Sequence, residues 1–274
     1  MGTILTLFGF AVVLYGVSTL FYLLSFINKK EYFIRRGVFF AGLGFLSHTI
    51  CISLYWTQPA YLSFSTFQII NDAAWAGVLV FLLVVLFARF VSPAGILIMP
   101  VTVFLQIWAA ISKKEIGMTP ASFDTPWFWI HVIASSLAYG SVLVAGAIGL
   151  LYLLKTRHAG EAFYDQLPDM NKLDNSSYLF IGIGFAMLTL MIISGALWTK
   201  QVHGSYWGWD PLEVQSLISW IVYAIWLHMR LTFGWRGKKL AWYSLLALPV
   251  MVIAIWGIPL VPGMFHRGFR ITHF

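Results

Sequence analysis

Residues 198–230 read WTKQVHGSYWGWDPLEVQSLISWIVYAIWLHMR, and this stretch decides how the rest of the chain is interpreted. Within it, a short loop containing Tyr206, Trp207, Trp209 and Asp210 separates two apolar segments. Trp and Tyr collect at the membrane–water interface of many membrane proteins, so two isolated tryptophans would indicate only an interfacial belt. Four aromatic or acidic residues within five positions, with glycine spacers, instead predict a flat, apolar surface that suits a flat, apolar ligand.

The segment that follows the tryptophans has the pattern of a helix start. Asp210 is a favoured N-cap, Pro211 is favoured at the first helical position, and Glu213 stands three residues after the cap, as in a capping box. Capping by itself would explain Asp210. A helix N-terminus at a membrane surface also attracts anions, so the same position predicts an anion-binding surface beside the aromatic rings.

The composition is that of a polytopic membrane protein. Of 274 residues, 60% are hydrophobic and 10% are charged, and the mean hydropathy is +0.82. We therefore predict an all-α fold with about eight transmembrane helices, in a single membrane domain that covers residues 1–274, the first helix being retained. The apolar runs long enough to span a bilayer, about 20 residues each, are 3–27, 37–57, 68–90, 93–111, 127–154, 178–198, 211–232 and 240–261.

The distribution of basic residues predicts the orientation of these helices. Placing the first, third, fifth and seventh interhelical loops inside collects twelve of the seventeen Lys and Arg residues. By the positive-inside rule, both termini and the aromatic loop (residues 199–213) then face outward, to a periplasm or a lumen. Topology thus explains the net charge of +7, and a nucleic-acid partner is not needed. The single Cys51 excludes an internal disulfide, a C-x-x-C dithiol and a C-x-x-C-H haem attachment site.

Histidines are the best metal ligands in this chain. His131 lies five residues past Pro126, about 8 Å below the outer surface at the rise of an α-helix, and His266 follows the eighth apolar run on the same side. A lone histidine at a helix end is usually structural. Two imidazoles at one level beside an aromatic loop could instead bind one iron axially from opposite faces. Polar residues below His131 that could hydrogen-bond its ring, or simply pack helices, are Ser135, Ser136 and Tyr139.

Two further histidines fall inside apolar runs, where a polar ligating group is costly and indicates a function. His228 lies about 26 Å along its helix from Pro211, near the inner surface. His48 lies about 16 Å from the inner surface, counted from Gly37, near the middle of the membrane. We predict that these two form a second, deeper metal site, which requires tilted helices because the estimated depths differ by about 10 Å.

At these residues the chain resembles the cytochrome c assembly family of haem-handling membrane proteins, and within it the CcsA (or ResC) type. Residues 204–213, GSYWGWDPLE, resemble the tryptophan-rich WWD segment of that family. The outer histidines of the family fall on His131 and His266, and the membrane-embedded histidine falls on His228. The segment around His48 resembles an N-terminal histidine segment of the family less specifically. The resemblance spans essentially the whole chain.

The resemblance implies that the protein binds haem b as a substrate and takes it from the inner side of the membrane. The haem would be presented outward between His131 and His266, over Tyr206, Trp207 and Trp209. Its vinyl groups would then react with the two thiols of a C-x-x-C-H sequence in apocytochrome c. The resemblance also implies a CcsB- or ResB-like membrane partner, with which the chain would form a holocytochrome c synthase. The expected location is the bacterial inner membrane or the thylakoid membrane.

Two other functions stay open at this point. A CcsA-like membrane regulator of haem synthesis would share the fold without making cytochromes, and a genome neighbour encoding a CcsB-like protein would argue against it. A secondary transporter of a small solute would predict inverted repeats and helices interrupted at the midplane. The sequence shows neither feature clearly.

Overall fold

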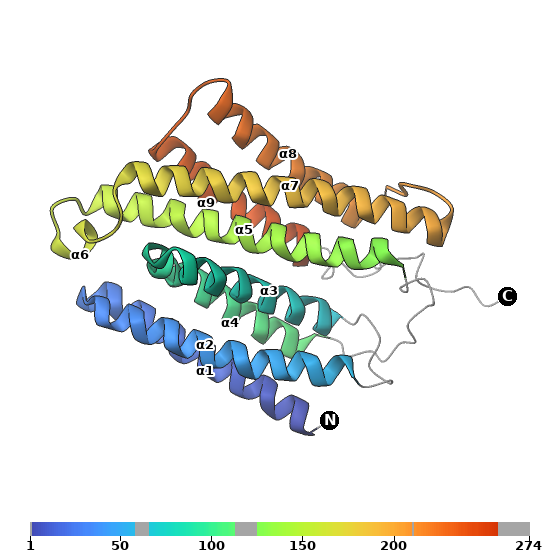
Figure 1. The fold of residues 1–274 in the computed structure, drawn as a ribbon, viewed down its shortest axis with the longest axis horizontal. Coiled ribbons are helices and arrows are strands. Elements are labelled where there is room, and N and C mark those ends of the chain that lie inside the picture. The colour runs from blue at the N-terminus through green and yellow to red at the C-terminus, as the bar shows by residue number, and fades with distance from the viewer. Residues whose placement is uncertain (1, 58–65, 113–124, 210, 257–274) are drawn as a thin grey trace.

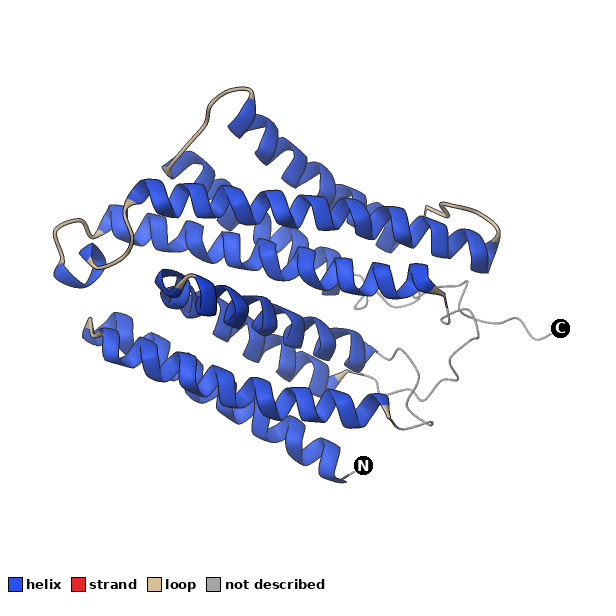
Figure 2. Ribbon diagram, in the orientation of Figure 1, coloured by secondary structure: helices blue, strands red, loops and turns tan. Residues whose placement is uncertain are grey.

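The computed structural model describes residues 2–57, 66–112, 125–209 and 211–256. All regular secondary structure in these ranges is helical, as the composition predicts (Figure 2). The elements are α1 (Gly2–Asn28), α2 (Glu31–Trp56), α3 (Thr66–Phe87), the 3-10 helix η2 (Arg89–Ala94), α4 (Gly95–Ile111), α5 (Pro126–Arg157), α6 (Ala162–Asp165), α7 (Met170–His203), α8 (Pro211–Leu231) and α9 (Lys238–Trp256).

The helices form a bundle in which α1 and α2 lie on one flank and α8 on the other, with α3, α4, α5 and α7 between them (Figure 1). The start of α1, the end of α2, the start of α5 and the loop of residues 204–209 lie at one end, here called the tryptophan end. The α1–α2 turn, η2, α6 and the loop of residues 232–237 lie at the opposite end, here called the basic end. This is the partition of loops that the basic residues predict. Which end faces which side of a membrane stays a prediction.

In the part of the chain that the structure describes, six helical segments are long and apolar enough to cross a membrane, so the chain has the helices of a membrane protein. The described parts of α8 and α9, which have charged residues near their ends, fall outside this set. The predicted number of eight spans is therefore supported in part and stays a prediction. The six segments are Gly2–Asn28, Glu31–Tyr55, Ile70–Phe87, Arg89–Ile111, Pro126–Arg157 and Met170–Val202.

The helix boundaries follow from recognisable capping residues. Thr125 caps α5 by accepting a hydrogen bond from Phe128 N–H at 3.3 Å, with proline at the first helical position. Asp169 caps α7 by accepting one from the backbone of Lys172 at 2.9 Å. Gly204 ends α7 in the left-handed conformation, with a φ of 76°. At 34 residues, α7 is much longer than the apolar run that predicts it, since polar turns extend it at both ends.

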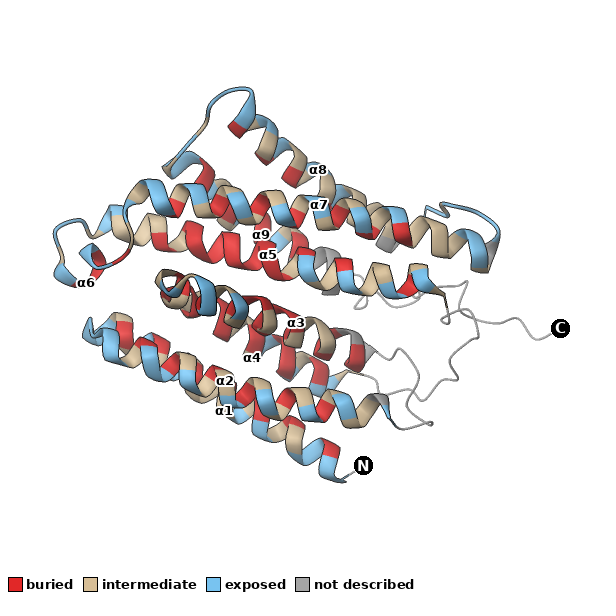
Figure 3. Cartoon of the chain, viewed as in Figure 1, coloured by how far each residue is buried: buried red, intermediate tan, exposed pale blue. Residues whose placement is uncertain are grey.

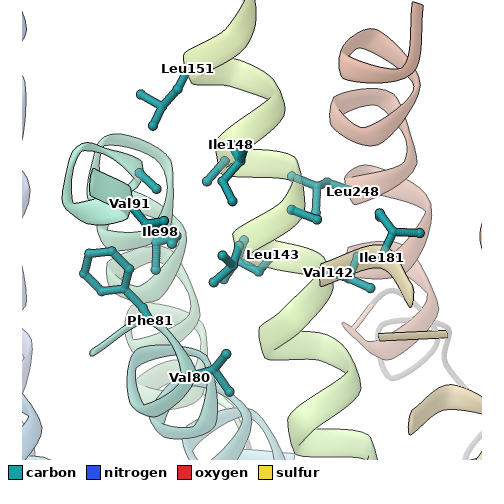
Figure 4. Packing of buried hydrophobic residues seen from close by; sticks show 14 of the residues in the cluster. Val80, Phe81, Val91, Ile98, Val142, Leu143, Ile148, Leu151, Ile181 and Leu248 are labelled. Carbon is teal, nitrogen blue, oxygen red and sulfur yellow. The ribbon is translucent and has the colours of Figure 1, made fainter. Parts of the chain in front are cut away.

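The core of the bundle is centred on α5. Burial is concentrated on α5 and on the helices beside it, and the outer faces of α1, α2 and α8 are exposed (Figure 3). In Figure 4, Val142, Leu143 and Ile148 of α5 lie between Phe81 of α3 and Leu248 of α9. Small residues permit this close packing. The position of His131 is therefore fixed by a helix that is held on several sides.

Candidate functional site

His131 is a partly buried side chain on α5 that faces α7. Its Nδ1 lies 2.8 Å from the backbone carbonyl oxygen of Met191. A carbonyl oxygen only accepts hydrogen bonds, so Nδ1 must carry the proton. The neutral ring then keeps a lone pair on Nε2, which is the form of imidazole that binds a metal ion. The contact therefore leaves the ring of His131 in the tautomer that a metal ion would need.

Aromatic side chains lie between His131 and the tryptophan end of the bundle. Phe128, one turn before His131 on α5, contacts the ring of Trp198 on α7, with ring centroids 5.7 Å apart. From Met191, α7 continues for twelve residues to His203, about 18 Å at the helical rise. The imidazole thus lies below the loop that follows α7 and is separated from it by about three turns of helix.

The loop of residues 204–209 presents the predicted aromatic side chains. The rings of Trp207 and Trp209 meet edge to face, with centroids 6.0 Å apart and planes at 84°. Tyr206 and Trp209 are exposed, and Trp209 has a positive φ of 57°, which is uncommon outside glycine. By contrast, Nε1 of Trp207 is buried without a hydrogen-bond partner in the described part of the chain. The loop thus offers apolar rings and one unused donor.

Polar contacts hold this loop between α7 and α8. Lys200 Nζ donates to the carbonyl oxygen of Gly204 at 2.6 Å and lies 5.3 Å from the centre of the Tyr206 ring. The carboxylate of Glu213 accepts a hydrogen bond from the backbone N–H of Gly208 at 2.7 Å. Glu213 therefore reaches back past the position of the predicted cap and into the loop. Asp210, the predicted cap, lies outside the described residues.

His48 has a different environment. It is fully buried on α2, and both ring nitrogens are hydrogen-bonded. Nδ1 lies 3.2 Å from the hydroxyl of Tyr15 on α1. Nε2 lies 3.0 Å from Asn71 Oδ1 on α3 and 3.3 Å from Gln106 Nε2 on α4. The ring thus connects four helices, and binding a metal ion would require breaking one of these contacts.

His228 is exposed at the basic end of α8. Its Nδ1 lies 3.2 Å from the hydroxyl of Thr232, and its ring meets the edge of Phe233 at a centroid distance of 5.4 Å. The side chain therefore lies on the outer surface of the bundle, where a second chain could contact it. Both contacts of the imidazole are with residues that directly follow the end of α8.

The structure does not bring His48 and His228 together, in contrast to the predicted second site. Helix α2 packs against α1, α3 and α4, whereas α8 packs against α7 and α9 on the other flank (Figure 1). In addition, α2 begins at Glu31, six residues before the position used to estimate depth. Counted from the other end of α2, at Trp56, His48 is only about 12 Å from the tryptophan end. His228 lies within one turn of the basic end of α8.

The hydrogen-bond partner of His131 is one that the sequence did not indicate. The hydroxyls of Ser135 and Ser136 each donate to the carbonyl of Val132 on their own helix, both at 2.8 Å. Tyr139 donates to the sulfur of Met191 at 3.4 Å. The actual partner of the imidazole is a backbone carbonyl, which has no signature in a sequence.

His266 lies outside the described residues, so its pairing with His131 stays a prediction. Among the residues that the structure does describe, no three His, Cys, Asp or Glu side chains gather into a metal site. A ligand that brings its own equatorial metal ligands, and needs only axial ones from the protein, is compatible with this arrangement.

The sequence model described as Cytochrome C assembly protein matches residues 66–266. The chain belongs to the cytochrome c assembly protein family. The matched range contains His131, the loop of residues 204–209, His228 and His266, whereas His48 precedes it. The predicted resemblance is thereby confirmed.

Relatives named cytochrome c biogenesis protein CcsA support the same membership. The chain is 31% identical to the protein of Chlamydomonas reinhardtii, over 93% of this chain and 73% of that protein. It is 28% identical to the protein of Guillardia theta, over 88% of each chain. Among solved structures, one named cytochrome c heme lyase CcmF matches 91% of this chain with a TM-score of 0.68 at 16% identity. This match shows a shared fold, and the chain covers only 45% of that CcmF chain.

Proposed function

We propose that this protein binds haem at the tryptophan end and presents it to apocytochrome c for covalent attachment, together with a CcsB-like membrane partner. Membership of the family supports a role in cytochrome c biogenesis. The observation that carries the more specific proposal is the hydrogen bond from His131 Nδ1–H to the Met191 carbonyl. It leaves Nε2 as the iron-binding nitrogen. His131 lies in the second turn of α5, which starts at the tryptophan end of the bundle.

Several features of the loop suit haem as the substrate. The rings of Trp207 and Trp209 offer apolar contact area to a porphyrin. The buried Nε1–H of Trp207 is a donor that a haem carboxylate could use, and the N-terminus of α8 attracts the same anionic group. In this proposal His131 and His266 are the two axial ligands. They hold the iron until the histidine of the incoming C-x-x-C-H sequence replaces one of them.

The attachment itself would be an addition reaction at each vinyl group. A cysteine sulfur forms a bond to one vinyl carbon, the thiol proton goes to the other carbon, and the carbon–carbon double bond becomes a single bond. No electron acceptor is required, so the iron can stay reduced throughout. The role of the protein is to hold the haem edge where the two thiols can reach it.

His228 fits an earlier stop on the path of the haem. It is exposed at the basic end, and His48 is held inside another part of the bundle. In this proposal the second ligand at this level comes from another chain. We assign this role to the CcsB-like partner. In this proposal the chain lies in the bacterial inner membrane or the thylakoid membrane, with the tryptophan end on the periplasmic or lumenal side.

The test is purification of the chain with its partner, followed by absorption spectra of His131→Gly, His266→Gly and the double variant. The proposal predicts loss of the bis-imidazole haem spectrum and of covalently attached haem in a co-expressed apocytochrome c, with recovery of the spectrum on addition of imidazole. His158→Gly is the matched control, since His158 lies at the basic end and contacts Glu161 at 2.8 Å. An unchanged spectrum in the double variant would exclude the outer site.

A further inference from the structure

We infer that Gly195 on α7 is a positioning residue for His131. The inference rests on the proposed haem-binding role of His131. A Cβ atom built on Gly195 would lie 2.8 Å from Nδ1 and 3.1 Å from Cε1 of the His131 ring. Non-bonded carbon and nitrogen atoms do not approach each other this closely, so the imidazole fills the space that any other side chain would need. Glycine at position 195 is what allows the ring to lie against α7.

This close approach is what makes the hydrogen bond to Met191 possible. Met191 and Gly195 are four residues apart, about one turn of α7. The imidazole lies against Gly195 at one end of this turn and contacts the carbonyl oxygen of Met191 at the other. The hydroxyl of Ser194 lies 3.2 Å from the same carbonyl oxygen and 2.6 Å from that of Leu190. The acceptor is therefore fixed within its helix, and only the ring can move away from it.

Helix formation does not explain glycine at this position. In a helix interior, glycine is about 1 kcal/mol less favourable than alanine. A Cβ atom added to Gly182, on the same helix, would meet no described atom within 4 Å, so alanine would fit there. Gly184 packs against Val142, with a Cβ distance of 2.7 Å, and so makes an apolar helix contact. Gly195 differs from both because its close neighbour is the imidazole.

The consequence for the iron follows from the two ring nitrogens. A carbonyl that accepts Nδ1–H fixes the tautomer and makes Nε2 a stronger electron donor. Substitution of Gly195 by alanine would displace the ring and break this bond. Loss of such a partner typically lowers metal affinity about 10- to 100-fold. It would also raise the midpoint potential of the bound haem, because a weaker donor stabilises ferric iron less.

The experiment is a double-mutant cycle on the purified full-length chain, titrated with haem and followed by its absorption spectrum. We expect Gly195→Ala to weaken binding about 10- to 100-fold and to raise the midpoint potential. In the His131→Gly background the same substitution should have no further effect, because Gly195 acts through the ring. Gly182→Ala should change neither quantity. Gly184→Ala should lower the melting temperature and leave the haem potential unchanged.

The outcomes separate this inference from the proposed function. If His131→Gly binds haem as well as the original chain, the proposed function fails and the inference fails with it. If His131→Gly weakens binding but Gly195→Ala does not, or if the two effects simply add, only the inference fails.

A second measurement does not depend on the folding of Gly195→Ala. Nitrogen NMR spectra of the haem-free chain labelled with [15N]histidine report which ring nitrogen carries the proton, and the His131 signals are those absent in His131→Gly. A proton on Nδ1 is expected. A proton on Nε2 would overturn the inference.

Discussion

His48 and His131 are both embedded in the helix bundle, yet the protein uses their two ring nitrogens differently. His48 contacts protein groups through both nitrogens and connects α1, α2, α3 and α4. His131 contacts one carbonyl through Nδ1, and the backbone rather than a side chain supplies that contact. The residue type is the same, although His48 is fully buried and His131 is partly buried. The number of nitrogens already used separates a histidine that holds helices together from one that keeps a nitrogen for the proposed iron ligation.

The largest effect is expected from a contact that involves neither histidine. Arg230 Nη1 lies 2.5 Å from Asp174 Oδ2, and the two side chains are 5% and 11% exposed. The other oxygen of Asp174 accepts from the backbone of Gly237 at 2.7 Å, which fixes the α8–α9 loop on α7. Arg230→Met leaves a buried carboxylate unpaired and should lower the free energy of unfolding by about 4 kcal/mol.

Thermal unfolding in detergent measures this loss. Arg35→Met is the control, because the pair of Arg35 with Glu31 is exposed and should contribute little. Equal melting temperatures for the two variants would show that the Arg230–Asp174 pair does not hold α8 on α7.

The difference in role between His48 and His131 is tested by substituting each of them with leucine. His48→Leu leaves the hydroxyl of Tyr15 and the amides of Asn71 and Gln106 without the ring, and should lower the free energy of unfolding by about 3 kcal/mol. His131→Leu removes one hydrogen bond from a carbonyl that stays within its helix, and should cost about 1 kcal/mol. Haem binding should be lost only in His131→Leu. Loss of haem in a well-folded His48→Leu variant would contradict the distinction.

A smaller effect is expected at Trp207, where a buried donor has no partner in the described part of the chain. Trp207→Phe removes that donor and should raise the free energy of unfolding of the haem-free protein by about 1 kcal/mol. The same change should weaken haem binding, since the ligand loses a hydrogen bond. Trp242→Phe is the matched control, because Trp242 is 47% exposed and lies in the first turns of α9, at the basic end. Chemical unfolding of both variants measures the expected gain in stability, and haem titration measures the expected loss of affinity.

The smallest effect concerns the contact between the two halves at the basic end. Glu161 pairs with Lys29 and with His158, and hydrogen bonding to Lys29 holds the pKa of Glu161 below its ordinary value of 4.5. This stabilisation is complete above pH 4.5 and is lost as the pH falls through the lowered pKa. The same pair raises the pKa of Lys29 above 10.5, so its contribution is lost only in strong alkali.

Melting curves of the original chain and Glu161→Gln, recorded from about pH 3 to pH 7, test this contact. We expect the original chain to melt slightly higher at neutral pH, and the two curves to converge at acid pH. Added salt should reduce the difference, because the groups are exposed. A difference that persists at the acid end would mean that Glu161 acts through packing and not through charge.

The sequence was sufficient to predict an all-helical chain with membrane-spanning segments, because each feature that it used is local. Apolar runs locate the helices, and Pro126 after Thr125 marks the start of α5 within one residue. Depth was predicted less well, since α2 extends six residues beyond its apolar run through a charged turn that contains Glu31 and Arg35. Apolar length measures the part of a helix that lies in lipid and not the whole helix.

The site was predicted only as far as its side chains. The aromatic loop and His131 could be singled out as candidates because Trp and His carry their chemistry in the side chain. The carbonyl of Met191 and the missing side chain of Gly195 could not be found in that way. Each matters only because α5 and α7 pack together, and they are 60 and 64 residues away from His131 in the chain. Ser135 and Ser136 were the obvious candidates, but serine in a helix tends to bond to its own backbone, as both do here.

The length of α7 has a consequence for where the proposed reaction would take place. Its 34 residues extend about 51 Å, whereas the hydrocarbon layer of a bilayer is about 30 Å thick. Even at a steep tilt of about 40°, that layer would cover only about 39 Å of the helix. At least two turns of α7 must therefore stand in the headgroup region or in water. A water-soluble cytochrome precursor could meet such a projecting helix end without entering the lipid.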